Sequence, residues 1–164
     1  MKRWSFLPRS RSKVVFILVM ASYSLAAGSL VGAIVVALGA QRVPPGVFLR
    51  RGYPMLEIVS LILIAPVVES LLLIGIIELL RWVRSPSWFQ IVCSATVFTI
   101  LHVPTSISNA FVVAPACFIM AAAYLVWRRE SWTTGFAVIM SIHFLLNLNQ
   151  AIWIFGYAIR HSNG

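Results

Sequence analysis

Aspartate is absent from this sequence, and all four of its acidic residues are glutamates. Catalysis by a pair of aspartates is therefore excluded. Only 10% of the 164 residues are charged and 60% are hydrophobic, whereas soluble domains are nearer a quarter charged and half apolar. A water-soluble fold of this length could not bury so much apolar surface, so we expect an all-α integral membrane protein.

Cysteine is also scarce. Cys93 and Cys117 stand in apolar stretches without CxxC spacing, so we expect small core side chains and neither a disulfide nor a zinc cluster. The 13 basic residues exceed the 4 acidic ones, which gives a net charge of 13 − 4 = +9. Because the basic residues stand at the edges of apolar runs, they indicate membrane anchors and not a nucleic-acid partner.

Long apolar runs predict five transmembrane helices, at residues 14–38, 55–80, 88–103, 109–127 and 132–157. The first run has 25 residues, longer than the roughly 7–15 of a signal peptide, so we interpret it as an uncleaved membrane helix. It follows a basic arm at residues 1–13. Residues 55–157 form a core of the other four helices, in which Pro104 ends or kinks the second. Pro44-Pro45-Gly46 predicts a turn before this core.

The distribution of basic residues predicts a cytoplasmic N-terminus, in a multi-pass protein of a cell membrane such as the bacterial inner membrane. This orientation places nine basic residues inside: Lys2, Arg3, Arg9, Arg11, Lys13, Arg81, Arg84, Arg128 and Arg129. It places four outside: Arg42, Arg50, Arg51 and Arg160. An aromatic belt is expected at the inner helix ends, formed by Trp82, Trp88, Trp127 and Trp132.

Polar side chains inside the predicted helices are the candidate functional residues, because an ionisable group at the bilayer centre costs about 2.5–3.5 kcal/mol. They are Glu69, His102, His143 and Asn147. At about 1.5 Å per helical residue, Glu69 and His143 lie about 18–20 Å from the inner charges. His102 lies about 21 Å from Trp88, and Asn147 about 26 Å from Glu130. All four therefore fall within one layer under about 10 Å thick.

Such a set has two interpretations. A glutamate beside an imidazole can hold a water molecule and take its proton, while a second imidazole and an amide donate to the oxyanion that forms. Alternatively, the four side chains form interhelical hydrogen bonds that hold the bundle together. We favour catalysis because all four share one depth. The HExxH and GxSG motifs of zinc and serine intramembrane proteases are absent.

Three spaced motifs carry a family resemblance. They are Phe98-Thr-Ile-Leu-His102, His143-Phe-Leu-Leu-Asn147, and a first motif that begins at Glu69. In this order they resemble the EExxxR, FxxxH and HxxxN motifs of the CPBP family of CAAX-type intramembrane proteases, over Leu56 to Gln150. The resemblance implies an intramembrane glutamic endopeptidase with a four-helix core. It implies that Glu69 and His102 activate the water, and that His143 and Asn147 assist the oxyanion.

The first motif departs from the family pattern, since Ser70 replaces the second glutamate and Ile74 the arginine. Either a supporting ion pair has been exchanged for small and apolar residues, or the chain is a catalytically inactive immunity or membrane binding protein. A small proton- or ion-conducting bundle is a third interpretation. Glu57 and Glu78 are interpreted as interfacial charges at helix ends.

We expect no cofactor, because the resemblance implies glutamate-activated water without a metal. A metal bound by Glu69, His102 and His143 as a 2-His-1-carboxylate set is the alternative. The expected partners are the lipid bilayer and a membrane-tethered protein or peptide substrate. With one helix before the core, the chain resembles short sorting-type members of the family, which process C-terminal anchors of exported proteins.

Overall fold

In the computed structural model, residues 12–40, 58–104 and 106–162 are described, with side chains through residue 156. The helices are α1 (Lys13–Ala37), the π-helix η2 (Ser60–Ile64), α3 (Ala65–Trp82), α4 (Ser87–Leu101), α5 (Ile107–Trp127) and α6 (Trp132–Ser162). The described ranges contain no strand, so the predicted all-α class is confirmed. Four stretches are long and apolar enough to cross a membrane, η2 and α3 counting as one, and α4 is a shorter apolar helix.

Helix boundaries differ from the sequence prediction by one to five residues at several places, three of which have a clear local cause. Helix α4 ends at Leu101 and not at residue 103, because Pro104 disfavours helical backbone at the residue before it. Helix α5 begins at Ile107, two residues early, where the hydroxyl of Ser106 accepts a hydrogen bond from the N–H of Asn109. Helix α6 continues past residue 157 to Ser162, because no proline or glycine interrupts this stretch.

Several predicted features lie outside the described residues. They are the basic arm up to residue 11, the turn at Pro44-Pro45-Gly46, the charges at Arg42, Arg50 and Arg51, and Glu57.

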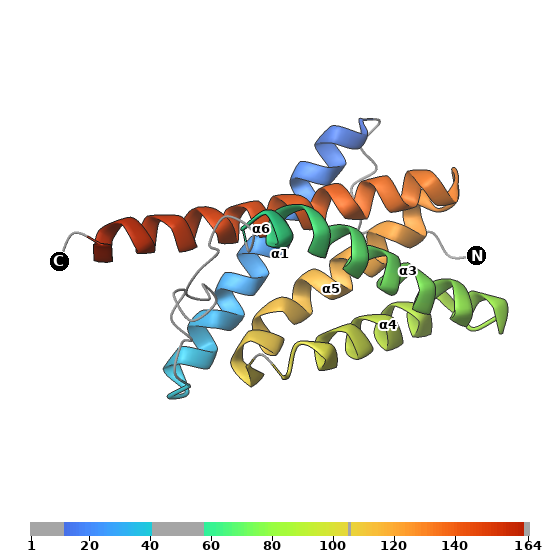
Figure 1. Cartoon of the computed structure of the whole chain (residues 1–164). Coiled ribbons are helices and arrows are strands. Elements are labelled where there is room, and N and C mark those ends of the chain that lie inside the picture. Colours follow the sequence, from blue (N-terminus) through green and yellow to red (C-terminus); the bar gives the residue numbers. More distant parts are fainter. Residues whose placement is uncertain (1–11, 41–57, 105, 163–164) are drawn as a thin grey trace.

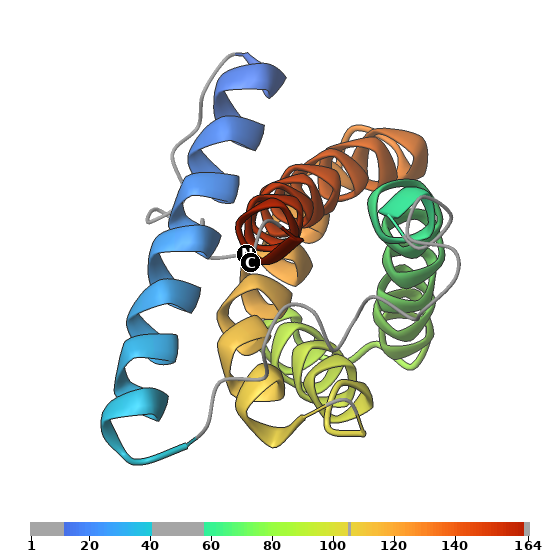
Figure 2. The same cartoon turned by 60° about the vertical axis from the view of Figure 1, so that its left-hand side comes forward.

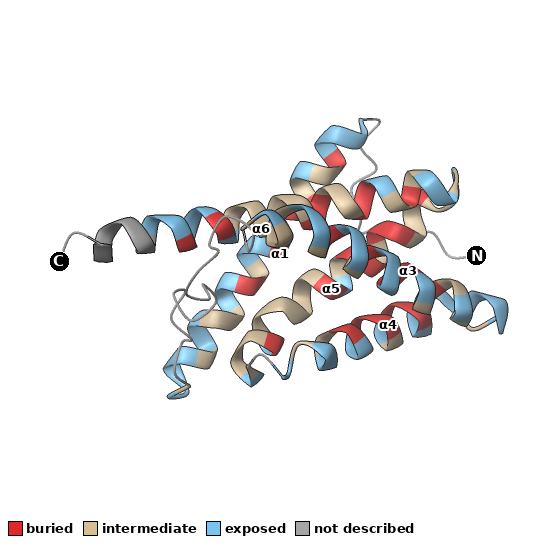
Figure 3. Cartoon of the chain, in the orientation of Figure 1, coloured by how far each residue is buried: buried red, intermediate tan, exposed pale blue. Residues whose placement is uncertain are grey.

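The four C-terminal helices form a ring around the core. Helix α3 packs on α4, α4 on α5, α5 on α6, and α6 packs back on α3 (Figures 1 and 2). Helix α1 lies outside the ring, against α5 and α6. Buried residues lie on every helix of the ring and on α1, while many large apolar residues are exposed (Figure 3). An apolar outer surface is what lipid requires of the helices that it contacts.

Helix α1 approaches α5 closely through two glycines spaced four residues apart. A Cβ atom on Gly28 would lie 3.0 Å from the carbonyl oxygen of Val112, and one on Gly32 would lie 3.5 Å from its side chain. Small residues at this spacing let two membrane helices come together by backbone packing. The GxxxG spacing is visible in the sequence and is a signal for this contact.

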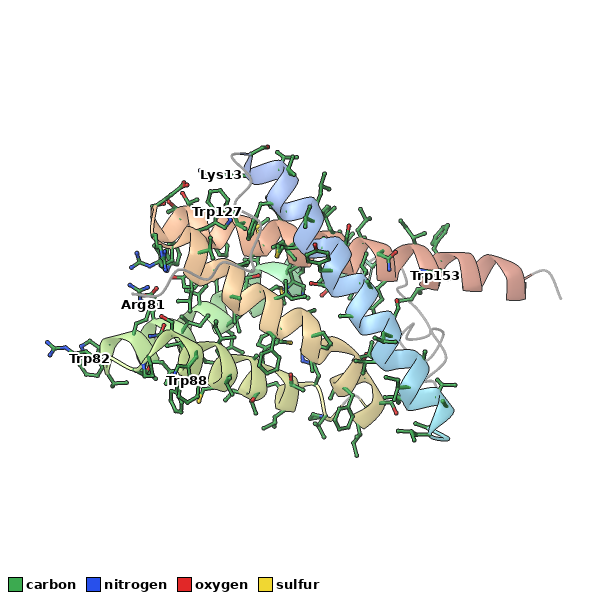
Figure 4. All side chains as sticks on the ribbon, turned by 180° about the vertical axis from the view of Figure 1, so that it is seen from behind. Lys13, Arg81, Trp82, Trp88, Trp127 and Trp153 are labelled. Atoms are coloured by element: carbon green, nitrogen blue, oxygen red, sulfur yellow. The ribbon has the colours of Figure 1, made fainter. Side chains whose placement is uncertain are left out.

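Charged and aromatic side chains gather at one end of the bundle. Lys13 forms an ion pair of 2.8 Å with Glu130 and lies 5.5 Å from the ring centre of Trp127. Figure 4 shows Lys13, Arg81, Trp82, Trp88 and Trp127 at this end, and Trp153 at the other. This grouping is consistent with the aromatic belt expected from the sequence.

Candidate active site

Three helices bring titratable side chains together around the carboxylate of Glu69 on α3. Its Oε2 atom lies 3.3 Å from Nε2 of His143 on α6 and 3.9 Å from Nε2 of His102 at the end of α4. Three of the four residues singled out by their shared depth in the sequence therefore meet at one point.

His102 is oriented by the backbone of its own helix. It is the C-cap residue of α4, and its Nδ1 atom lies 2.9 Å from the carbonyl oxygen of Phe98, one turn earlier. A carbonyl oxygen only accepts hydrogen bonds, so this contact places the ring proton on Nδ1. In the neutral imidazole, Nε2 is then an acceptor, and it is the atom that faces Glu69. The Phe98 ring, 5.2 Å away centre to centre, packs against the imidazole.

Accessibility falls from one member of this site to the next. The side chains of Glu69, His102 and His143 are 33%, 22% and 8% exposed. The Nδ1 atom of His143 has no hydrogen-bond partner among the described residues. The carboxylate and the first imidazole are thus the accessible part of the site, and His143 forms its buried wall.

Asn147 is the candidate whose hydrogen bond goes to η2 and not to Glu69. It stands one turn after His143 on α6, and its Nδ2 atom donates to the carbonyl oxygen of Leu61 in η2 at 2.9 Å. Its partner is a backbone atom, which no side-chain pattern in the sequence could have indicated.

A second polar cluster lies nearer the end of α3. The carboxylate of Glu78 accepts hydrogen bonds from the Tyr124 hydroxyl at 2.6 Å and from Nε of Arg128 at 2.8 Å, and Arg81 is 3.5 Å away. The hydrogen bond to Glu78 raises the pKa of Arg128. The sequence placed Glu78 at a helix end but gave no sign of this link to α5, because its partners follow 46 and 50 residues later.

The described residues contain no group of three His, Cys, Asp or Glu side chains arranged to hold a metal ion. The 2-His-1-carboxylate alternative therefore gains no support from the arrangement of these side chains.

A family model described as type II CAAX prenyl endopeptidase Rce1-like matches residues 51–149, which include all four candidate residues and most of the ring of helices. The chain belongs to this family. The matched range agrees with the resemblance identified from the motifs, which is thereby confirmed. No curated protein and no solved structure matches the chain.

Two residues of this Rce1-like chain stand where the CPBP motif has its second glutamate and its arginine. Ser70 is 1% exposed and Ile74 is 3% exposed, and Ile74 belongs to the hydrophobic core. The hydroxyl of Ser70 has no hydrogen-bond partner among the described residues. At these two positions the chain thus has buried, uncharged side chains.

Proposed function

We propose that this Rce1-like protein is an intramembrane glutamic endopeptidase, which hydrolyses a peptide bond of a membrane-tethered protein. The observation that carries the proposal is the meeting of one carboxylate and two imidazoles, from three helices, with separations of 3.3 and 3.9 Å. Because each ionisable group inside a membrane is costly, their convergence on one point favours a chemical role.

The nucleophile is a water molecule held by Glu69 and His102. The 3.9 Å between Oε2 and Nε2 is too long for a direct hydrogen bond. It suits a water about 2.8 Å from both atoms, at an angle of about 90°. Both atoms are acceptors, so the water donates both hydrogens and directs its lone pairs outward. This geometry is the one required for attack on a carbonyl carbon.

The reaction then needs two proton transfers and one oxyanion donor. Glu69 takes a proton from the water as the oxygen bonds to the scissile carbonyl carbon. Protonation of Glu69 removes the charge that attracts the Nε2–H of His143, and this N–H then donates to the oxyanion. Glu69 next gives its proton to the leaving nitrogen as the C–N bond breaks, which yields a carboxylic acid and an amine. A general base of this kind contributes about 10²–10⁴-fold, and an oxyanion donor about 10²–10³-fold.

The substrate is a protein or peptide that a lipid or a helical anchor holds in the bilayer. An apolar cavity of about 410 Å³ lies between α1, η2 and α6, with Leu18, Leu63 and Phe144 among its lining residues. Glu69, His102 and His143 do not line this cavity, but Phe144 directly follows His143 on α6, so a tether in the cavity would bind α6 at the same level along the helix as His143. The excess of basic residues at the inner helix ends supports a cytoplasmic N-terminus in a multi-pass cell-membrane protein.

The test is cleavage of a tethered fluorogenic peptide by purified protein in liposomes. Glu69→Gln removes the base while keeping the side chain's size, so cleavage should fall at least about 100-fold. Glu78→Gln is the matched control, on the same helix but outside the site, and it should stay active. A fully active Glu69→Gln protein would refute the proposal. Loss of activity with a chelator, restored by zinc, would instead support the metal alternative.

A catalytically inactive immunity or membrane binding protein is the second candidate. It is favoured by Ser70 and Ile74, which leave the first motif without its ion pair. A protective or binding activity that survives alanine at both His102 and His143 would select this candidate.

A further inference from the structure

The helix that carries Glu69 begins with an interrupted hydrogen-bond ladder. The N–H of Ala65 donates to the carbonyl of Ser60, five residues back, which makes η2 a π-helix. The next bond of this ladder would join the N–H of residue 66 to the carbonyl of Leu61. Residue 66 is proline, which has no N–H. The Leu61 carbonyl therefore lacks a donor from its own helix.

Asn147 supplies the missing donor from α6. Its Nδ2 atom lies 2.9 Å from the Leu61 oxygen, across 86 residues of sequence. An unsatisfied carbonyl in an apolar environment is unfavourable, and lipid offers no water to replace the bond. The side chain of Asn147 thus completes the hydrogen bonding of η2.

This bond also sets the register of the two helices that meet at the site. Leu61 precedes Glu69 by two helical turns, and Asn147 follows His143 by one turn. Helices α3 and α6 run in opposite directions (Figure 1). One bond between Asn147 and Leu61 therefore fixes how far α3 slides along α6, and with it the 3.3 Å separation of Glu69 and His143.

We propose that Asn147 is a positioning residue, which holds Glu69 against His143 by bonding the carbonyl that Pro66 leaves without a donor. This inference rests on the proposed endopeptidase function. It differs from a direct role for Asn147 at the oxyanion, because it makes the need for Asn147 depend on Pro66.

The test combines Asn147→Ala with Pro66→Ala. Replacing the proline restores an N–H that can bond within the helix, so Leu61 no longer needs Asn147. Asn147→Ala alone should lower kcat about 10- to 100-fold by displacing Glu69. In the Pro66→Ala background it should have little further effect. An equal loss of kcat in both backgrounds would overturn the inference and assign Asn147 to the oxyanion.

Two measurements need no catalysis and so separate this inference from the proposed function. The midpoint of thermal unfolding in detergent should fall with Asn147→Ala, and by less when Pro66→Ala is also present. Hydrogen exchange over residues 58–66 should rise in Asn147→Ala and stay unchanged in the control Asn149→Ala, which lies on another face of α6. The exchange test stands even if Pro66→Ala does not fold. Unchanged exchange in Asn147→Ala would refute the positioning role, whether or not the wild-type protein cleaves a peptide.

Discussion

Shortening Glu69 by one methylene group tests the geometry of the site separately from its charge. Glu69→Asp keeps a carboxylate but withdraws it along the side chain by about 1.5 Å, one carbon–carbon bond. The distance to Nε2 of His102 then rises from 3.9 Å to about 5 Å. A single water with two 2.8 Å bonds and its ordinary angle spans at most about 4.4 Å. The shortened carboxylate and His102 can therefore no longer hold one water between them.

The expected effect follows from the size of this displacement. A misplacement of about 1 Å in a catalytic group costs about 100-fold in rate, so we expect kcat to fall by at least that factor. In free energy this is about 2.7 kcal/mol of lost transition-state stabilisation. The bond to His143 is also lost, since 3.3 Å is already near the upper limit for a hydrogen bond.

The assay compares initial cleavage rates per folded molecule in liposomes. Glu78→Asp is the control, because it makes the same change nine residues further along α3, about 13 Å from the site. Its rate should stay within about threefold of wild type, since it displaces no reacting group. A Glu69→Asp protein that keeps a rate in that range would refute the water-bridging geometry.

Three further substitutions test the packing that supports the site. Glu78→Gln removes the charge that binds Arg128, and because these side chains are about a third exposed, unfolding in detergent should become easier by about 1–2 kcal/mol. Gly28→Val places side-chain atoms against the backbone of α5 and should lower the free energy of unfolding by about 1–3 kcal/mol. Gly75→Val is the control, because the space around Gly75 is open, and it should lower the free energy of unfolding by less. Ser70→Glu buries a carboxylate in the apolar core and should abolish folding, which is measured as loss of the folded band in detergent gel electrophoresis. A folded, active protein would show that the core tolerates the glutamate that the family usually has at this position.

The sequence predicted the helices and the depth of the site because a membrane constrains both. A helix must be long and apolar to cross lipid, so the runs of apolar residues locate the helices directly. Polar residues are rare in such runs, which made Glu69, His102 and His143 stand out. Their distances from the helix ends predicted one layer, and Glu69, His102 and His143 lie close together in the structure.

The remaining features depend on contacts that the sequence does not encode locally. Asn147 bonds a backbone carbonyl, and Glu78 bonds Tyr124 and Arg128 on another helix. Predicting the π-helix would have required the hydrogen-bond register of the turn before Pro66, because this register decides which carbonyl the proline leaves without a donor. The length of α6 was underestimated because its last residues are polar, and helices continue past the end of an apolar run when nothing breaks them.

The length of α6 has a consequence for how it sits in the bilayer. Its 31 residues span about 46 Å at 1.5 Å per residue, against a hydrocarbon layer of about 30 Å. Tilt alone would have to reach about 50° to accommodate the whole helix, beyond the usual range of about 0–40°. The last turns of α6 must therefore leave the hydrocarbon and continue among the lipid headgroups. The helix that carries His143 and Asn147 therefore lies partly in the hydrocarbon layer and partly among the lipid headgroups.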